Sequence, residues 1–290
     1  MCDDHTVDEN EKFFRKPGMS RRQFSKLSAG VALAMMLPPV ANAQDVVESD
    51  VSVQTPDGMA DCYFVHPASG QHPAVIIWPD ILGLRPAFRA MGKRLAQSGY
   101  SVLVVNPFYR SAKSPVVPEG ASFGDPAIRS IVLPMAGALN AQTHMSDARA
   151  FVSFVDQQSA VDTSRKIGTT GYCMGGPIVM RTAAAVPDRI GAGASFHGGG
   201  LNTANDDSPH LLIPSMKAHF LIAIAANDDE RDPESKNVLR ESFDTAGLPA
   251  EIEVYQAQHG WCPPDSAVYD EALAERAWSR MLALFDTALA

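Results

Sequence analysis

The sequence predicts an α/β fold, with a mostly parallel sheet, an N-terminal antiparallel hairpin and helices on both faces. Short apolar runs bounded by proline or glycine alternate with segments of helical periodicity along most of the chain. The first two runs instead flank a tight turn. The 290 residues are 46% hydrophobic and 20% charged, as in ordinary globular proteins. Because no internal repeat, charge run or long linker interrupts the pattern, we expect one domain from about residue 45 to 290.

Turn residues and prolines mark the first elements. Residues 46–67 form two runs around the turn Pro56-Asp57-Gly58, which predicts the hairpin. The run 73–80 is apolar between prolines, as expected of a strand buried on both faces of a parallel sheet. A helix is predicted over 86–97, where apolar residues recur on one side.

The same alternation continues to the C-terminus. After a strand at 100–108, a segment rich in proline, glycine and serine at 111–124 reads as an excursion from the fold. Further strands are predicted at 166–172, 190–197, 219–228 and 251–259, and helices at 142–156, 174–186, 233–246 and 267–288. This order of elements is typical of a parallel sheet.

The first 43 residues have the pattern of a twin-arginine export signal. The stretch Ser-Arg-Arg-Gln-Phe-Ser-Lys at 20–26 precedes an apolar segment at 27–40, which ends in Ala-Asn-Ala at 41–43. A membrane anchor would need about 18 or more apolar residues, whereas this segment is shorter and is interrupted by Pro38 and Pro39. We therefore expect a periplasmic or secreted protein that is a partner of the twin-arginine machinery and has no stable membrane anchor.

Charge argues against nucleic acid as a partner. Cleavage after residue 43 would leave 18 basic and 28 acidic residues, with no basic cluster interleaved with aromatic residues. Three cysteines would remain, Cys62, Cys173 and Cys262, so at least one thiol is free or pairs with another chain.

The stretch Gly171-Tyr172-Cys173-Met174-Gly175 lies where a predicted strand meets a predicted helix. A buried cysteine is often only a small hydrophobic residue. At such a junction, however, Gly-x-Cys-x-Gly is typical of a strained elbow that exposes a nucleophile above a sheet. The helix start behind it would favour the thiolate.

Two later residues complete the set that a nucleophile requires. A catalytic triad in a fold of this type runs nucleophile, acid, histidine, with the last two on loops after later strands. Asp228 ends the predicted strand 219–228, and His259 ends the predicted strand 251–259. Asp229 is the alternative acid, but Asp228 lies nearer the strand, where the chain is better held.

These residues carry a resemblance to a known family. The stretch Gly171-Tyr172-Cys173-Met174-Gly175-Gly176 with Asp228 and His259 resembles the dienelactone hydrolases (carboxymethylenebutenolidases) of the α/β-hydrolase fold. The similarity extends from about Val53 to the end of the chain. It implies hydrolysis of a small ester or lactone through a Cys-His-Asp triad and an acyl-enzyme, with no cofactor.

The resemblance also implies roles for residues near the nucleophile. Asp80, in Trp-Pro-Asp-Ile-Leu-Gly, stands where the family has a glutamate that helps to activate the nucleophile. The backbone N–H groups of Met174 and Ile81 would form the oxyanion hole. Arginines hold the substrate carboxylate in the best-known members, but Pro263 occupies one of the two positions. Arg129 is a candidate for the other position, and Trp261 is a further candidate for substrate contact.

Two other readings compete with the dienelactone reading. A broader carboxylesterase or thioesterase would use the same triad, and a non-catalytic exported binding protein would keep only the fold and its pocket. His-Gly-Gly-Gly at 197–200 looks like a lipase oxyanion motif, but it follows the nucleophile and is therefore predicted to be a loop without a role. No metal site is predicted, because the remaining histidines lack partners at ligand spacing: His66, His72, His144 and His210.

Overall fold

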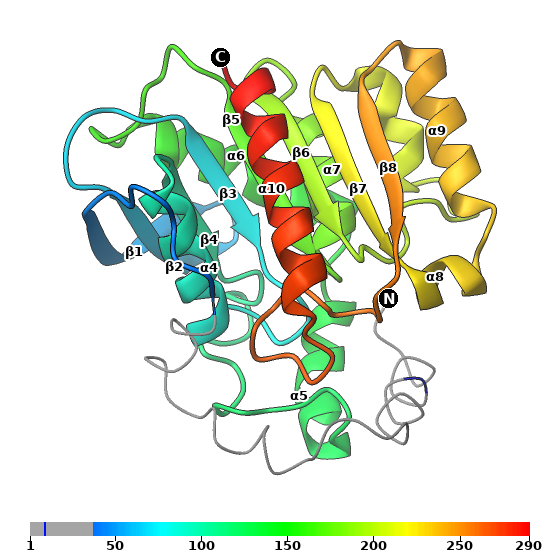
Figure 1. Ribbon diagram of the computed structural model, residues 1–290. Helices are drawn as coiled ribbons and strands as arrows, with labels where there is room; N and C mark the ends of the chain where they lie inside the picture. The colour runs from blue at the N-terminus through cyan, green and yellow to red at the C-terminus, as the bar shows by residue number, and fades with distance from the viewer. Residues whose placement is uncertain (1–8, 10–36) are drawn as a thin grey trace.

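A computed structural model describes residue 9 and residues 37–290, so the twin-arginine motif predicted at 20–26 lies outside the described residues. The chain forms an eight-stranded sheet in the order β1-β2-β4-β3-β5-β6-β7-β8 (Figure 1). The strands are β1 (Val46–Thr55), β2 (Gly58–Pro67), β3 (Ala74–Trp78), β4 (Ser101–Val105), β5 (Ile167–Tyr172), β6 (Ile190–Phe196), β7 (His219–Ala225) and β8 (Ala250–Tyr255).

The sheet has the predicted mixture of strand directions. β1 and β2 form an antiparallel hairpin, and β2 also pairs antiparallel with β4. From β4 to β8 every pairing is parallel. The α/β-hydrolase arrangement predicted for the chain is therefore confirmed, and the carboxyl ends of the parallel strands meet at one edge.

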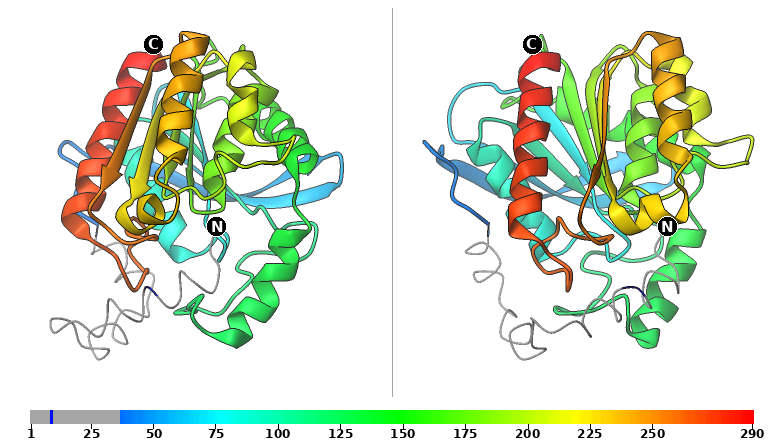
Figure 2. Two further views of the ribbon diagram at one scale, coloured as in Figure 1. Left: turned by 90° about the vertical axis from the view of Figure 1, so that its right-hand side faces the viewer. Right: turned by 45° about the vertical axis from the view of Figure 1, so that its right-hand side comes forward.

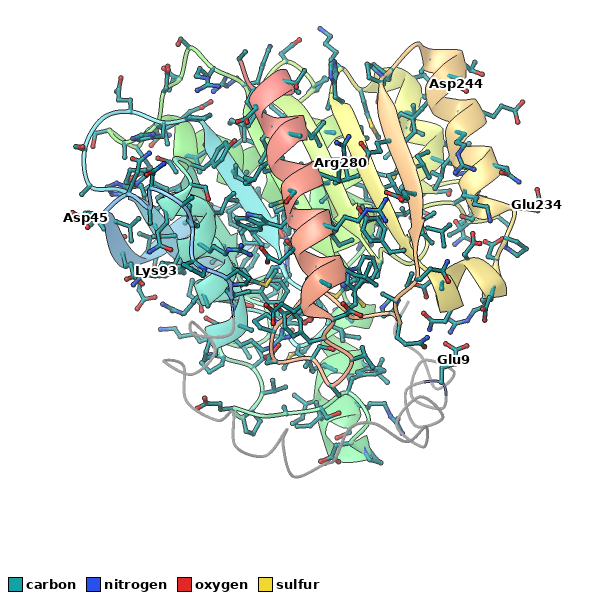
Figure 3. All side chains as sticks on the ribbon, in the orientation of Figure 1. Glu9, Asp45, Lys93, Glu234, Asp244 and Arg280 are labelled. Carbon is teal, nitrogen blue, oxygen red and sulfur yellow. The ribbon has the colours of Figure 1, made fainter. Side chains whose placement is uncertain are left out.

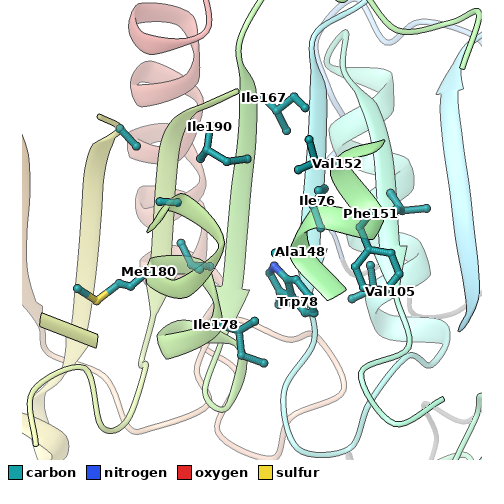
Figure 4. Packing of buried hydrophobic residues seen from close by; sticks show 14 of the residues in the cluster. Ile76, Trp78, Val105, Ala148, Phe151, Val152, Ile167, Ile178, Met180 and Ile190 are labelled. Atoms are coloured by element: carbon teal, nitrogen blue, oxygen red, sulfur yellow. The ribbon is translucent and has the colours of Figure 1, made fainter. Parts of the chain in front are cut away.

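Helices cover both faces of the sheet (Figures 1 and 2). On one face lie α4 (Pro86–Gln97) and α10 (Glu271–Ala288), and on the other lie α6 (Ala141–Asp156), α7 (Gly175–Ala185) and α9 (Ser235–Ala246). Each face has its own apolar cluster. On the α6 side, Trp78 of β3 meets Phe151 of α6 edge-on, with ring centroids 5.5 Å apart (Figure 4).

The outer surfaces of the helices are charged. Lys93 on α4 and Arg280 on α10 lie on the outside of the molecule (Figure 3). Lys93 pairs with Glu48 of β1, and Arg280 pairs with Glu251 of β8. Exposed pairs of this kind contribute little to stability, so the two apolar clusters carry most of it. No helix within residues 37–290 is long and apolar enough to cross a membrane.

Three short elements differ from the prediction: α5 (Pro126–Gly137), the 3-10 helix η1 (Pro209–Ser215) and α8 (Ala226–Arg231). The apolar residues of α5 show weak helical periodicity in the sequence. Only two of them, Ile128 and Val132, are buried. Asp125 caps it by accepting a hydrogen bond from the Ala127 N–H. The strand predicted over 219–228 was too long, since its last residues form α8.

Candidate active site

Cys173 lies on a strained turn between β5 and α7. Its φ angle is +52°, which non-glycine residues rarely adopt. The flanking glycines are steric requirements: a Cβ on Gly171 would lie 2.3 Å from the Gly175 carbonyl oxygen, and one on Gly175 would lie 2.3 Å from that of Trp78. This is the geometry of a nucleophile elbow.

His259 joins the thiol to an acid. Its Nδ1 lies 2.7 Å from Asp228 Oδ2, and its ring also hydrogen-bonds to the Cys173 side chain. The His259 backbone N–H donates to Asn227 Oδ1 at 2.8 Å, which fixes the loop after β8 against α8. Asp229, the alternative acid, is instead ion-paired with Lys236 at 2.6 Å.

The electrostatics favour an ion pair at this site. Burial alone would lower the pKa of His259, but Cys173 and Asp228 outweigh it and raise the pKa to about 10. Burial would raise the pKa of Asp228, but His259 outweighs it and the pKa is lowered. At neutral pH the triad therefore favours an imidazolium between a carboxylate and the sulfur.

The other two described cysteines lie in a different environment. Cys62, Cys173 and Cys262 are all free thiols. Burial raises the pKa of Cys62 to about 12 and that of Cys262 well above its ordinary value. Protonated thiols are poor nucleophiles, so of these three described thiols only Cys173 has the surroundings of a reactive cysteine.

Asp80 is held by an arginine that sequence reasoning missed. Arg85 makes a bidentate pair with Asp80, at 2.7 and 2.9 Å, and a second one with Asp265, at 2.6 and 2.9 Å. Asp80 also accepts the Leu82 N–H at 2.9 Å. Burial raises the pKa of the Asp80 carboxyl, while Arg85 opposes that shift and Cys173 is near enough to add to it.

Asp80 therefore lies near enough to Cys173 for the two to interact, but its oxygens are committed to Arg85 and a loop amide. No spacing in the sequence could have revealed this cluster, because Arg85 and Asp265 are 180 residues apart. The cluster connects the loop after β3 to the loop that follows His259.

The two amides predicted for the oxyanion hole lie next to the elbow. Met174 stands at the N-terminal end of α7, and Ile81 lies in the buried loop after β3. Among the described residues, neither N–H donates to a backbone or side-chain acceptor. Both are therefore available to a substrate oxygen, and the start of α7 adds a positive dipole end.

A third apolar cluster covers this loop from α5, which lies beyond the carboxyl ends of the parallel strands (Figures 1 and 2). Ile81 and Leu82 pack with Ile128 and Val132 of α5, and Met174 packs against the same cluster. Arg129, predicted as a substrate contact, is a half-buried residue of α5. The surroundings of the two amides are therefore mainly apolar.

Trp261, predicted as a further candidate for substrate contact, lies behind the site in this structure. Its side chain is fully buried, stacks on Tyr255 with ring centroids 5.4 Å apart, and lies edge-on to His197 at 5.1 Å. The loop at 197–200 follows β6 as predicted, but His197 lies against the triad, with its ring centroid 5.0 Å from that of His259.

No cluster of histidine, cysteine or carboxylate side chains that could hold a metal occurs among the residues that the structure describes. The fold, with a cysteine elbow after β5, Asp228 on α8 and His259 on the loop after β8, is that of an α/β-hydrolase.

Comparison with known proteins gives the family. The sequence profile of the dienelactone hydrolase family matches residues 60–289, and the chain belongs to this family of ester hydrolases. A candidate carboxymethylenebutenolidase of Methylorubrum extorquens is 25% identical over 275 residues, which cover 91% of each chain. The carboxymethylenebutenolidase of Rhodococcus opacus is 25% identical over 77% of this chain and 85% of its own.

A solved structure, that of a candidate dienelactone hydrolase from Klebsiella pneumoniae, superposes with a TM-score of 0.72 at 22% identity. The match covers 84% of this chain and 100% of the other. At this level of identity the similarity supports the fold.

Proposed function

We propose that this chain hydrolyses a small ester or lactone through an acyl-enzyme on Cys173. The observation that carries the proposal is the arrangement of His259, which bonds Asp228 on one side and Cys173 on the other. Acyl transfer needs a nucleophile, a base and oxyanion donors, and no cofactor.

In the first half of the reaction, the Cys173 sulfur forms a bond to the substrate carbonyl carbon. The carbonyl oxygen becomes an oxyanion, which accepts hydrogen bonds from the N–H groups of Met174 and Ile81. The intermediate then collapses: the bond to the alkoxy oxygen breaks, and His259 gives its proton to that oxygen. A thioester on Cys173 remains.

The second half releases the acid. His259, now neutral, takes a proton from water as the water oxygen attacks the thioester carbon. Breaking the carbon–sulfur bond then returns the Cys173 thiolate and frees the carboxylic acid. Asp228 keeps the imidazole in one orientation throughout and stabilises its charged form.

We expect neutral substrates to compete well with anionic ones at this site. Pro263 stands where dienelactone-specific members of the family place an arginine, and the cluster around Ile81, Leu82 and Met174 is apolar. We therefore favour a neutral ester or lactone. The names of the relatives support a lactone as the group that is cleaved, and a broader carboxylesterase or thioesterase activity would use the same groups.

Trapping of the acyl-enzyme tests this proposal. The mature protein is mixed with dienelactone, a simple lactone, an aryl ester or a thioester, quenched in acid within seconds and weighed by mass spectrometry. An acyl adduct on Cys173 is expected with at least one substrate. Cys62→Ala, which removes a buried thiol elsewhere, is the control that keeps the adduct.

Turnover without an adduct would contradict the covalent mechanism. Tight binding of these compounds with no turnover would instead indicate the non-catalytic binding protein.

We also propose that the protein is exported by the twin-arginine route, on the motif at 20–26. The test is fractionation of cells that express the full chain or its Arg21→Lys, Arg22→Lys double variant. Periplasmic or secreted protein is expected for the natural sequence, and protein retained in the cytoplasm for the variant. Equal distribution of the two would refute export by this route.

A further inference from the structure

His197 is a buried imidazole beside the nucleophile that the proposed reaction does not use. Its side chain is 1% exposed, and its ring lies 5.0 Å from that of His259 and 5.1 Å from that of Trp261, measured between centroids. Among the described residues, neither ring nitrogen makes a hydrogen bond of normal geometry, and the neighbour placed to form one is the Cys173 side chain, which opposes the lowering of the His197 pKa by burial. An unsatisfied buried donor costs about 1–3 kcal/mol, so a hydrogen bond from this ring to the Cys173 sulfur would be favoured.

The backbone holds His197 against the elbow. Its φ angle is +41°, and its N–H donates to the Ala223 carbonyl oxygen at 2.8 Å. A Cβ on the next residue, Gly198, would lie 3.0 Å from the Cα of Gly176. Cys173 and His197 are thus two non-glycine residues in left-handed backbone, on neighbouring turns that pack together. Strain of this kind persists where the surrounding structure enforces it, and it is concentrated at functional sites.

The groups around His197 keep it neutral. Three charged or titratable groups face the ring: Cys173 on the elbow, His259 on the loop after β8 and Asp228 on α8. The Tyr172 ring lies 6.2 Å away, measured between centroids. Burial lowers the pKa of His197, and Cys173 and Asp228 offset this only in part. A neutral imidazole keeps one N–H donor. It can therefore bond to the sulfur without competing with His259 for the thiol proton.

We propose that His197 is a positioning residue of the nucleophile, whose ring N–H donates to the Cys173 thiolate. The sulfur is then held between two imidazoles, a charged His259 and a neutral His197. No covalent bond changes at His197. The inference rests on the proposed function in taking Cys173 as the nucleophile. A hydrogen bond to a charged group contributes about 1.5–3 kcal/mol, or roughly 10- to 150-fold in an equilibrium.

The test compares two substitutions at this position. His197→Phe keeps an aromatic ring against Trp261 but has no donor, whereas His197→Gln keeps an N–H. The rate of iodoacetamide alkylation of Cys173 is measured from pH 5 to 10 by peptide mass spectrometry, without substrate. For His197→Phe we expect the half-maximal rate at a pH about one to two units higher and kcat/KM about 10- to 100-fold lower.

His197→Gln should restore most of the alkylation profile and most of kcat/KM. The control His66→Gln, which alters a histidine of β2 away from the site, should behave as wild type. If Phe cannot be accommodated, His197→Leu removes the donor in a smaller side chain. A wild-type alkylation profile in the variant without a donor would overturn the inference. Equal losses in the Phe and Gln variants would overturn it as well, because they would indicate packing alone.

Failure here can be told apart from failure of the proposed function. Alkylation reports on the thiol and needs no turnover, whereas the proposed function depends on loss of turnover in Cys173→Ala. If Cys173→Ala is inactive while His197→Phe has an unchanged alkylation profile, the mechanism stands and only the role of His197 is removed.

Discussion

Asp228 Oδ2 lies 2.7 Å from His259 Nδ1, and this contact leaves the other ring nitrogen of His259 for the Cys173 sulfur. Asp228 reaches this position from α8, and His259 from the loop after β8. The pairing of β7 with β8 brings α8 and this loop together. One hydrogen bond thus sets both the tautomer and the direction of the base.

Asp228→Asn is expected to lower kcat/KM by about 10² to 10⁴, because an amide can leave the imidazole in the wrong tautomer. Asp229→Asn is the matched control, since that carboxylate pairs with Lys236. Its kcat/KM should stay within about twofold of wild type, because partly exposed ion pairs contribute little. A larger loss in Asp229→Asn than in Asp228→Asn would show that the acid has been assigned wrongly.

Asp80→Asn should lower both activity and stability. The substitution removes a carboxylate from the buried cation of Arg85, and breaking such a pair typically costs about 3–5 kcal/mol. It also removes a charge near Cys173, for which we expect roughly a tenfold fall in kcat/KM. Asp265→Asn disturbs the same arginine from the other side and should lower stability with a smaller effect on rate.

The measurements are denaturant unfolding and steady-state kinetics of both variants. If Asp80→Asn were destabilised but kept the wild-type rate, Asp80 would be a structural residue only, as its bond to the Leu82 N–H would allow.

The pKa values of the two histidines at the site are shifted in opposite directions, so the two rings should titrate at different pH. An imidazole is charged at pH values below its pKa. Because the pKa of His259 is raised to about 10, its ring should stay protonated at neutral pH and lose the proton near pH 10. His197, whose pKa burial lowers, should remain neutral through the neutral range. NMR of labelled histidine rings between pH 5 and 10 measures both.

Alkylation of Cys173 provides the control for this titration. It removes the thiolate that raises the pKa of His259, so the His259 midpoint should then fall. A His259 midpoint near the ordinary 6.5 in the unmodified protein would contradict the ion pair.

The charge of the substrate should have little effect on the rate of hydrolysis, or should favour the neutral form. The arginine missing at Pro263 corresponds to a charge-assisted contact of about 1.5–3 kcal/mol. We therefore expect the methyl ester of dienelactone to be hydrolysed at least as well as the free acid at moderate salt. A preference for the free acid above about tenfold in kcat/KM would show that a cation, for instance Arg129 on α5, compensates.

The elements with strong periodicity could be predicted from the sequence, and others could not. The run 73–80 and the helix over 86–97 correspond to β3 and α4, because tertiary packing and local pattern agree there. α5 was not predicted, since only Ile128 and Val132 are buried along it. The end of β7 was misjudged because α8 begins at Ala226, directly after the apolar run, and no proline or glycine separates the two.

The site shows the same division. The elbow follows a local rule, in that glycines are needed two residues either side of Cys173, and chain order then identified Asp228 and His259. Arg85 and Asp265 follow no local rule, because their contact depends on two loops meeting in space. His197 was dismissed with its glycines as a loop for the same reason: only the sheet brings the end of β6 to the elbow.

Replacement of Cys173 by alanine tests the central claim most directly. The measurement is kcat/KM of correctly folded Cys173→Ala on the best substrate of the panel, with the Cys62→Ala and Cys262→Ala variants measured alongside. We predict that turnover is lost in Cys173→Ala and retained in the other two. A folded Cys173→Ala protein that kept even about a tenth of the wild-type kcat/KM would show that the nucleophile lies elsewhere.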